Sequence, residues 1–287
     1  MPLAFQTHLL SFNGRSHTVR EIADDSFRLS EEIRPPDFAQ SIDEHILSLV
    51  RSERESLEQA DIKGNLCVLL PSSVDKSLLK ALISELSIFV DQTVNTEIYF
   101  YPYGQAAFLM ALNRINREVN ETQATWILAI EVTSDVEGHV KPQSSIILTK
   151  CFFRHSGLVP DVVRIDLDAK QQRIAVDKVF KQLGVSCEHP LSQLYLSVNE
   201  EEPQWLNSMQ FLSPWVTDQT QYQFVDIKLG GLGACGGVLK ALVIDELQRS
   251  SPCPDFHVLQ ADIEPDGYAV GVIYNWRVNR SGYCFSF

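Results

Sequence analysis

The sequence predicts an α/β protein made of two similar halves, and three observations support this prediction. Strand-like segments alternate with helical segments of roughly 10–20 residues, which is typical of largely parallel sheets. At a shift of 130 residues, 106–112 (AAFLMAL) lies over 236–242 (GGVLKAL), and the strand starting at Trp126 lies over that starting at Phe256. Both matched helical segments are apolar on nearly all sides, so each half is expected to bury one helix.

The first half is predicted from residues 61–155, after a polar segment. Residues 15–43 are rich in charge and contain Pro35 and Pro36, so residues 1–60 are predicted to form an irregular lead-in or cap that ends in a helix over about 41–59. Regular structure is expected to start near Ser41. The predicted strands are 65–70, 96–101, 124–132 and 143–153, and the predicted helices are 75–93 and 104–119.

The second half is predicted from residues 156–287. Its strands are expected at 159–167, 193–198, 222–228, 256–262 and 267–276, and its helices at 169–183, 203–211 and 232–248. Each half ends in two successive strands, which predicts an antiparallel edge on each sheet.

The two helices that match each other have unusual composition. Between Gly104 and Leu112 the single polar residue is Gln105, and between Gly233 and Leu247 the polar residues are Lys240, Asp245 and Glu246. A helix without a polar face is buried on all sides. We therefore expect both helices to lie between two sheets, with Gly233, Gly236 and Gly237 present because the neighbouring backbones approach closely.

Composition and charge restrict the classes of function. The chain has 287 residues, 45% of them hydrophobic, which is enough for a sizeable core. Its net charge of −13 argues against nucleic acid and anionic membrane surfaces as partners. The N-terminus has no basic, apolar secretory signal, and no run approaches the ~18 apolar residues that span a bilayer. We expect a cytoplasmic protein with no membrane or nucleic-acid partner.

The stretch 228–242 (KLGGLGACGGVLKAL) contains GxGxxG at Gly231, Gly233 and Gly236. A dinucleotide site needs this turn between a strand and a helix, with an acid after the next strand, for which Asp262 and Glu264 are at a tolerable spacing. Such a motif normally opens its domain, however, and only 51 residues follow Gly236. We predict that no dinucleotide or other cofactor binds here.

These patterns resemble the thiolase-like superfamily and, within it, the β-ketoacyl synthases. In that family a GHxxGAAG segment leads into the C-terminal buried helix, and residues 233–236 (GACG) are similar to its second part. Residues 104–112 (GQAAFLMAL) and 126–134 (WILAIEVTS) are similar to the nucleophile helix and the strand behind it. The resemblance covers about residues 60–275. It implies an α/β fold with αβαβα layers, in which two buried central helices lie between two mixed five-stranded sheets.

The catalytic positions of that family differ in this sequence. The family places a cysteine where the third strand turns into the first buried helix, because a helix N-terminus lowers the thiol pKa. That position falls near Tyr101, in YFYPYG, which has neither Cys nor Ser. The two histidines of the family would fall near Ser197 and Gly230. The resemblance therefore predicts that the ketosynthase chemistry has been lost.

Other groups could carry chemistry, and each has an ordinary structural explanation. Cys235 lies in the first turn of a helix, where a low thiol pKa is physically possible, but a cysteine at a packed position explains it as well. Cys187 and His189 offer two metal ligands where a site needs three or four. The acidic triplet 200–202 could act as a base or bind a cation, or be a solvated helix start. His139 and His155 fall in loops. The six cysteines form no CxxC pair, and we expect them reduced and mostly buried, with no metal site (Cys67, Cys151, Cys187, Cys235, Cys253 and Cys284).

The first functional hypothesis is a catalytically inactive protein that acts through protein–protein interaction. Proteins of this superfamily commonly dimerise through the edge strand that leads to the nucleophile, so the partner is expected to be a second copy, another thiolase-fold protein or a secretion effector or component. Degenerate ketosynthase-like proteins occur as accessory proteins of bacterial gene clusters, including type VI secretion clusters, which implies an adaptor role. The interface candidates are Thr96, Ile98, Phe100, Tyr101 and Tyr103.

The second hypothesis is an inactive partner of an active ketosynthase, similar to a chain-length factor, in fatty acid or polyketide synthesis. The chain is much shorter than a full ketosynthase, and its acidic charge would repel an acidic acyl carrier protein, which is therefore a less expected partner. A residual enzyme with a relocated nucleophile is the third hypothesis.

Overall fold

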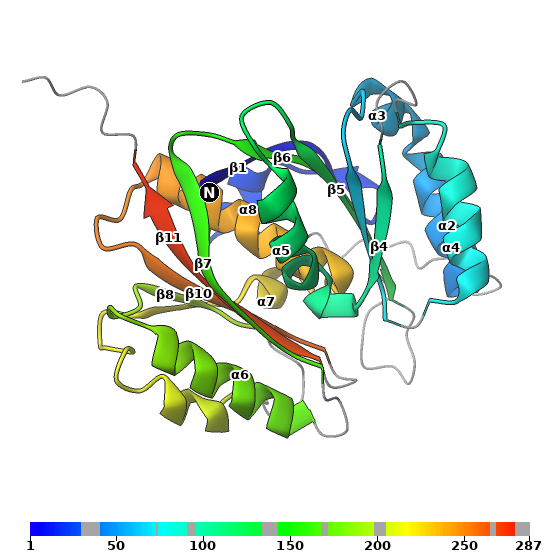
Figure 1. Cartoon of the computed structure of the whole chain (residues 1–287). Coiled ribbons are helices and arrows are strands. Elements are labelled where there is room, and N and C mark those ends of the chain that lie inside the picture. Colours follow the sequence, from blue (N-terminus) through cyan, green and yellow to red (C-terminus); the bar gives the residue numbers. More distant parts are fainter. Residues whose placement is uncertain are drawn as a thin grey trace, which may run out of the picture.

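The protein folds into five layers in the order helix, sheet, helix, sheet, helix (Figure 1). The structure is a computed structural model that describes residues 1–29, 41–72, 74–90, 96–133, 143–167, 172–197, 205–264 and 268–278. The middle layer contains α5 (Ala107–Glu118) and α8 (Ala234–Ser250), and residues of both helices from Ala107 to Leu112 and from Ala234 to Asp245 are almost all buried. The predicted central helices are confirmed.

The two sheets repeat one topology. The first has the order β4 (Ile98–Pro102), β3 (Leu66–Leu70), β5 (Thr125–Thr133), β6 (Gln143–Phe153) and β1 (Leu3–Phe12). The second has the order β9 (Gln221–Gln223), β8 (Gln193–Tyr195), β10 (His257–Ile263), β11 (Ala269–Arg277) and β7 (Gly157–Asp166). In each sheet the first three strands are parallel and the last two pairings are antiparallel. The predicted duplication is therefore present strand for strand.

The sheets are joined where β1 and β7 meet, at the single register pair Leu3 and Leu158. A short strand, β2 (Arg15–Ser16), pairs with the end of β1. Each sheet has the predicted antiparallel side, but β6 and β11 are not its outermost strands, because β1 and β7 pair beyond them. The open edges in the described part of the chain are β4 and β9.

The N-terminal segment is not an irregular lead-in, and that part of the prediction was wrong. β1 is a ten-residue strand, buried at both ends and paired along its length with β6. Its pairing register shifts between Thr7 and Leu9, so a bulge interrupts the alternation of buried and exposed side chains. Without that alternation the sequence carries no clear strand signal. The helix α1 (Val19–Ala23) follows, with a capping box from Thr18 and Glu21.

Several other boundaries differ from the predictions. The helix expected at 41–59 is divided at Glu53 into α2 (Ile42–Ser52) and α3 (Arg54–Gln59). The next, α4 (Lys76–Leu86), ends early. The strand expected at 222–228 is wrong in its second part, where α7 (Val225–Leu229) forms instead. The remaining helical elements of the described chain are the α-helix α6 (Gln172–Ser186) and two 3-10 helices, η1 (Gly104–Ala106) and η2 (Asn207–Phe211).

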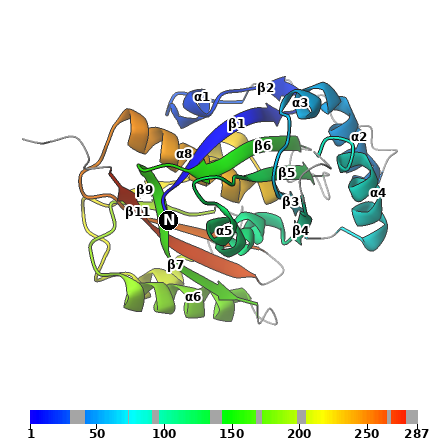
Figure 2. The ribbon, with the colours of Figure 1, turned by 45° about the horizontal axis from the view of Figure 1, so that its top comes forward.

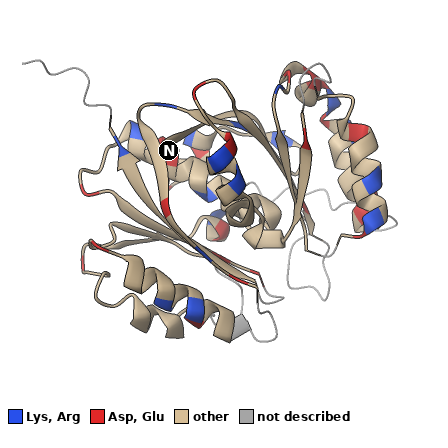
Figure 3. Ribbon diagram, in the orientation of Figure 1, with Lys and Arg blue, Asp and Glu red and all other residues tan. Residues whose placement is uncertain are grey.

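Each sheet carries helices on its outer face. α2, α3 and α4 cover the first sheet, and α6 with η2 covers the second, each through its own apolar cluster (Figure 2). Charged residues occur along the outer helices and also in the later turns of α5 and α8 (Figure 3). The apolar cluster of the middle layer surrounds α5 and α8. Within the described residues, no helix is both long and apolar enough to cross a membrane.

Candidate functional site

The candidate site lies where the buried helices α5 and α8 begin. The turn before each helix contains a glycine in the left-handed region, Gly104 with φ +52° and Gly233 with φ +43°. Residues other than glycine rarely adopt this backbone conformation. The first backbone N–H groups of a helix point out of its end and favour a negative charge there.

Two glutamates occupy these helix ends, and each comes from the other half of the chain. Glu264, which follows β10 in the second half, accepts a hydrogen bond from the Gln105 backbone N–H at 2.7 Å. Glu131, on β5 in the first half, accepts one from the Ala234 backbone N–H at 2.7 Å. The two halves are therefore joined by a reciprocal pair of carboxyl groups at the ends of the buried helices.

The glycines are required by these carboxyl groups as well as by their backbone conformation. A Cβ added to Gly104 would lie 2.2 Å from Glu264 Oε2, and one added to Gly233 would lie 2.0 Å from Glu131 Oε2. Both distances are far below van der Waals contact. The absence of a Cβ at these two glycines thus leaves room for the glutamate carboxyl groups to reach the helix ends.

Glu131 and Glu264 are both buried, with exposed fractions of 6% and 8%. Burial raises the pKa of Glu131 to about 8; the Ala234 N–H acts in the opposite direction and the charge of Glu264 adds to the rise. Glu131 therefore holds a proton at neutral pH. Glu264 also accepts a hydrogen bond from Ser72 Oγ at 3.0 Å.

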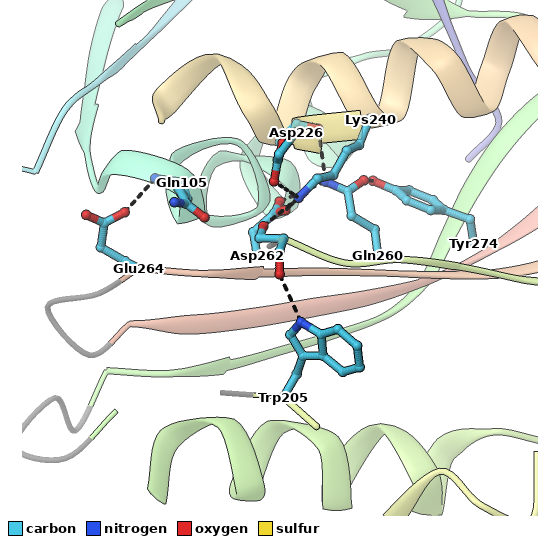
Figure 4. Close-up of polar contacts among 10 residues, drawn as sticks. Gln105, Trp205, Asp226, Lys240, Gln260, Asp262, Glu264 and Tyr274 are labelled. Atoms are coloured by element: carbon cyan, nitrogen blue, oxygen red, sulfur yellow. Dashed lines mark hydrogen bonds and ion pairs between the residues drawn. The ribbon is translucent and has the colours of Figure 1, made fainter. Parts of the chain in front are cut away.

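A second polar cluster lies deeper along α8, around Lys240 (Figure 4). The Lys240 ammonium is 1% exposed and donates to Ser197 Oγ at 2.6 Å and to Asp262 Oδ1 at 2.8 Å. Asp226 Oδ2 lies 3.9 Å from the same nitrogen. Burial alone would lower the pKa of Lys240, but the charges of Asp226 and Asp262 outweigh it, and the pKa is raised.

Neutral groups complete this second cluster. Gln260 Nε2 donates to Asp262 Oδ2 at 2.7 Å and to the Gly237 carbonyl at 2.9 Å, and Tyr274 lies at the far end with its hydroxyl 3.4 Å from Gln260 Oε1. Lys240 is protonated and held among internal acceptors. It is therefore not available to act as a base.

The two helices touch at Gly237. A Cβ there would lie 3.0 Å from Phe108 Cβ on α5 and 2.8 Å from Asp262 Oδ2. The predicted close approach is thus present at Gly233 and Gly237. At Gly236 an added Cβ would meet no atom closer than 3.4 Å, so the prediction was wrong for that residue.

The three positions expected from the sequence to match the family's catalytic residues have different surroundings in this structure. Ser197 is buried and belongs to the Lys240 cluster. Tyr101 lies half-buried in β4, packed toward the middle layer. Gly230 is exposed at the turn between α7 and α8, where an added Cβ would lie 2.8 Å from Gln143 Oε1. Of the three, the structure brings Ser197 alone into a described polar cluster.

Cys235 is fully buried in the first turn of α8, and its Sγ lies 3.5 Å from the Ser145 carbonyl. Burial, followed by the charge of Glu131, raises its pKa well above the usual value. The helix end therefore does not produce a thiolate at this residue. The other described cysteines are buried except Cys253, which is half-exposed.

The remaining candidates form no site in the described part of the chain. His189 stacks on His257 with ring centroids 4.8 Å apart, and His155 contacts Phe153 edge to face. Among the described residues no three His, Cys, Asp or Glu side chains come together to hold a metal ion. The triplet 200–202, His139 and Cys284 lie outside those residues.

The predicted interface residues line β4, which pairs on one side with β3 and is an open edge within the described chain. Ile98 and Phe100 pack toward the outer helices, and Tyr101 and Tyr103 toward the middle layer. With Thr96, all five are half-buried. Whether they form an interface stays a prediction.

Sequence reasoning missed the roles of Glu131, Glu264, Lys240 and Asp262. Asp262 and Glu264 drew attention there as candidate ribose ligands, and Lys240 as a polar residue in an apolar helix. The available signal was a charged residue inside a segment predicted to be buried, because such a charge needs a partner in the fold. The sequence could not identify the partners, which lie 22 to 159 positions away.

The chain has the thiolase-like fold, which three solved structures share at low sequence identity. The 1,3,6,8-tetrahydroxynaphthalene synthase of Streptomyces coelicolor A3(2), a bacterial type III polyketide synthase, is 14% identical, with 91% of this chain and 85% of that chain covered and a TM-score of 0.52. The oxazolomycin ketosynthase domain OzmH KS8 of Streptomyces albus JA3453 is 10% identical, with 96% and 95% covered and a TM-score of 0.56.

The third is the AntDE:AntF complex, a type II polyketide synthase acyl carrier protein with its ketosynthase. It is 10% identical, with 97% of this chain and 100% of that chain covered and a TM-score of 0.53. No protein-family model and no curated protein sequence matches the chain.

Proposed function

We propose that this thiolase-fold protein performs no ketosynthase chemistry and acts by binding another protein. The observation that supports this most directly is the occupation of both helix ends by internal carboxyl groups. Backbone N–H groups at such ends are suited to hold a developing oxyanion. Here the N–H groups of Gln105 and Ala234 already donate to Glu264 and Glu131, so neither is free to hold an oxyanion.

Acyl transfer is tested by mass spectrometry on the C253S/C284S variant, which lacks the half-exposed thiol and the thiol outside the described residues. The intact protein is incubated with acyl-CoA, malonyl-CoA or acylated carrier protein, beside an active β-ketoacyl synthase as the positive control. We expect no stable acyl adduct, because burial raises the pKa of Cys67 to about 12 and that of Cys235 well above its usual value. A stoichiometric adduct on any remaining cysteine would contradict the proposal.

We further propose that β4 forms the protein contact, with a second copy of the chain or another thiolase-fold protein across it. The strand is an open edge within the described chain and carries a row of apolar and aromatic side chains. Exposed edges of this kind pair with other strands. Light scattering after gel filtration measures the assembly of the wild type, Phe100→Lys and the control Ile83→Lys on the exposed side of α4. We expect Phe100→Lys alone to dissociate the complex; equal masses for both variants would exclude β4.

The partner distinguishes two roles. In the first, the protein is an accessory or adaptor protein of a bacterial secretion gene cluster, of the type VI kind. In the second, it is the inactive partner of an active ketosynthase, which one observation favours: a structural neighbour is a ketosynthase in complex with an acyl carrier protein. Affinity purification from the native cell separates them. A secretion component supports the first role, and a ketosynthase or carrier protein supports the second.

A further inference from the structure

A cavity of about 870 Å³ lies beside the C-terminal half of α8, away from the N-terminal ends of the buried helices. It is bounded by the inner side of the second sheet near β9, by the C-terminal half of α8 and by α1, with Val243, Leu247 and Ile22 among its apolar wall residues. Val243 and Leu247 follow Ala234 by 9 and 13 positions, which corresponds to about 14 and 20 Å along the helix. The cavity therefore lies well away from the start of α8. Lys240 is only three positions from Val243, but none of the residues named for either polar cluster lines the cavity.

The floor of the cavity contains Tyr195, a fully buried residue of β8. Within the described part of the chain its hydroxyl has no hydrogen-bond partner, although buried polar groups are almost always paired. Burial, followed by the nearby charge of Asp25, raises the pKa of Tyr195, so the phenol keeps its proton and is a donor. A bound molecule with an acceptor oxygen would satisfy it.

The charges around the cavity favour an uncharged ligand. Lys228 donates to Asp25 Oδ1 at 2.8 Å and to the Asp24 carbonyl at 3.3 Å, so its charge is already compensated. Apart from histidines, the wall has one further charged residue in the described chain. This is Asp255, which is negative and exposed at the rim. An anion would meet no uncompensated cation here. A cation would lose its hydration against apolar walls.

We propose that this cavity binds an uncharged small molecule with both apolar and polar groups, whose carbonyl oxygen accepts a hydrogen bond from Tyr195. The volume lies within the range of ordinary ligand sites. The apolar wall residues would contact its apolar part, and the wall glutamines offer further amide donors and acceptors (Gln193, Gln219, Gln221 and Gln223). The Tyr195 hydroxyl is covered by neighbouring side chains, and a small change in their rotamers would expose it to the oxygen of the bound molecule. Such rotamer changes are common on binding. This site is independent of the function proposed above.

The test uses prodan, an uncharged naphthalene ketone that fluoresces at shorter wavelength in apolar surroundings. We expect saturable binding by the full chain, with anilinonaphthalene sulfonate, an anion of similar size, binding at least tenfold more weakly. Bound prodan should also slow alkylation of Cys253, a wall residue, measured by peptide mass spectrometry. Absence of saturable prodan binding, equal affinity for the anion, or an unprotected Cys253 would each overturn the proposal.

Two matched pairs of variants locate the site. Ser251→Trp fills the rim, whereas Ser250→Trp alters the neighbouring exposed residue, which is not on the wall. Tyr195→Phe removes the hydroxyl, and Tyr274→Phe removes another buried hydroxyl, in the Lys240 cluster. We expect Ser251→Trp and Tyr195→Phe to weaken binding, the latter by roughly tenfold for one lost hydrogen bond. Equal affinities within the serine pair would overturn the location, and equal affinities within the tyrosine pair would overturn the role of Tyr195.

Discussion

Gly104 and Gly233 have the same two constraints, a left-handed backbone and a carboxyl group in the place of a side chain. Gly14 has a similar φ of +74° but no atom within 4 Å of an added Cβ. Substitution of Gly14 therefore measures the cost of the backbone conformation without that of the displaced carboxyl group. A left-handed residue other than glycine costs about 1–2 kcal/mol, and displacing the carboxyl group leaves a buried N–H without its acceptor, which costs about 1–3 kcal/mol more.

We accordingly expect Gly104→Ala and Gly233→Ala to lower the free energy of unfolding by about 3 kcal/mol or more, and Gly14→Ala by about 1 kcal/mol. Urea denaturation followed by circular dichroism measures all three. If the three variants lose the same stability, the carboxyl groups do not restrict these glycines.

Glu131 makes the stability depend on pH. Its pKa is about 8 in the folded protein and 4.5 ordinarily, so between these values the folded state binds more protons than the unfolded state. The contribution of Glu131 to the free energy of unfolding is most favourable below pH 4.5 and is lost as the pH rises through 8. At 1.36 kcal/mol per pKa unit, the total loss is at most about 5 kcal/mol.

Glu131→Gln keeps an acceptor oxygen for the Ala234 N–H but cannot ionise. We expect the variant to gain stability relative to the wild type as the pH rises from 5 to 8.5, measured by urea denaturation at each pH. Comparison of the two proteins cancels the titration of other groups. Parallel stability curves would show that Glu131 is not protonated in the folded protein.

At the scale of elements, α8 depends on a charge pair that the sequence places in an apolar helix. Asp262 is 0% exposed, and Lys240 is its charged partner at 2.8 Å. Removal of one partner of a buried pair leaves an uncompensated charge and costs about 3–5 kcal/mol. Replacement of both by neutral residues removes the charge of Asp262, although Asp226, 3.9 Å from Lys240 Nζ, still loses its cation.

We expect Lys240→Met to lower the free energy of unfolding by about 3–5 kcal/mol, and the double variant Lys240→Met/Asp262→Asn to recover part of that loss. Denaturation of the wild type, both single variants and the double variant gives the coupling energy directly. Additive losses would mean that the pair contributes no interaction of its own.

The whole molecule is joined across its middle layer. Glu131 and Glu264 each bind a helix of the other half, and α5 contacts α8 at Gly237. Residues 1–155 and 156–287 repeat one topology, because β1 belongs to the first sheet, but each sheet buries its inner face against helices of both halves. One half alone would expose that face to water.

We therefore expect fragments 1–155 and 156–287 to be insoluble or unfolded when produced separately, and to form a folded complex when produced together. Circular dichroism and gel filtration measure both states. A cooperative unfolding transition of either isolated fragment would show that the halves are independent domains.

Much of the architecture follows from the sequence alone because it depends on local periodicity. The apolar residues on all sides of 107–112 and 234–244 require burial wherever the helices lie, and the shift of 130 residues indicates that both halves use the same plan. The absence of Cys and Ser from 99–104 is likewise a property of the sequence. β1 was missed because a bulge at residues 7–9 disrupts the alternation on which strand prediction depends.

The tertiary structure decided which groups meet. Glu131 and Ala234 are 103 positions apart, and Glu264 and Gln105 are 159 apart, so no local pattern connects them. Their meeting depends on how the halves pack, as does the cavity between α1, α8 and the second sheet. A sequence states that a buried charge needs a partner, because desolvation is costly wherever it occurs. Only the packing of distant segments determines which partner satisfies it.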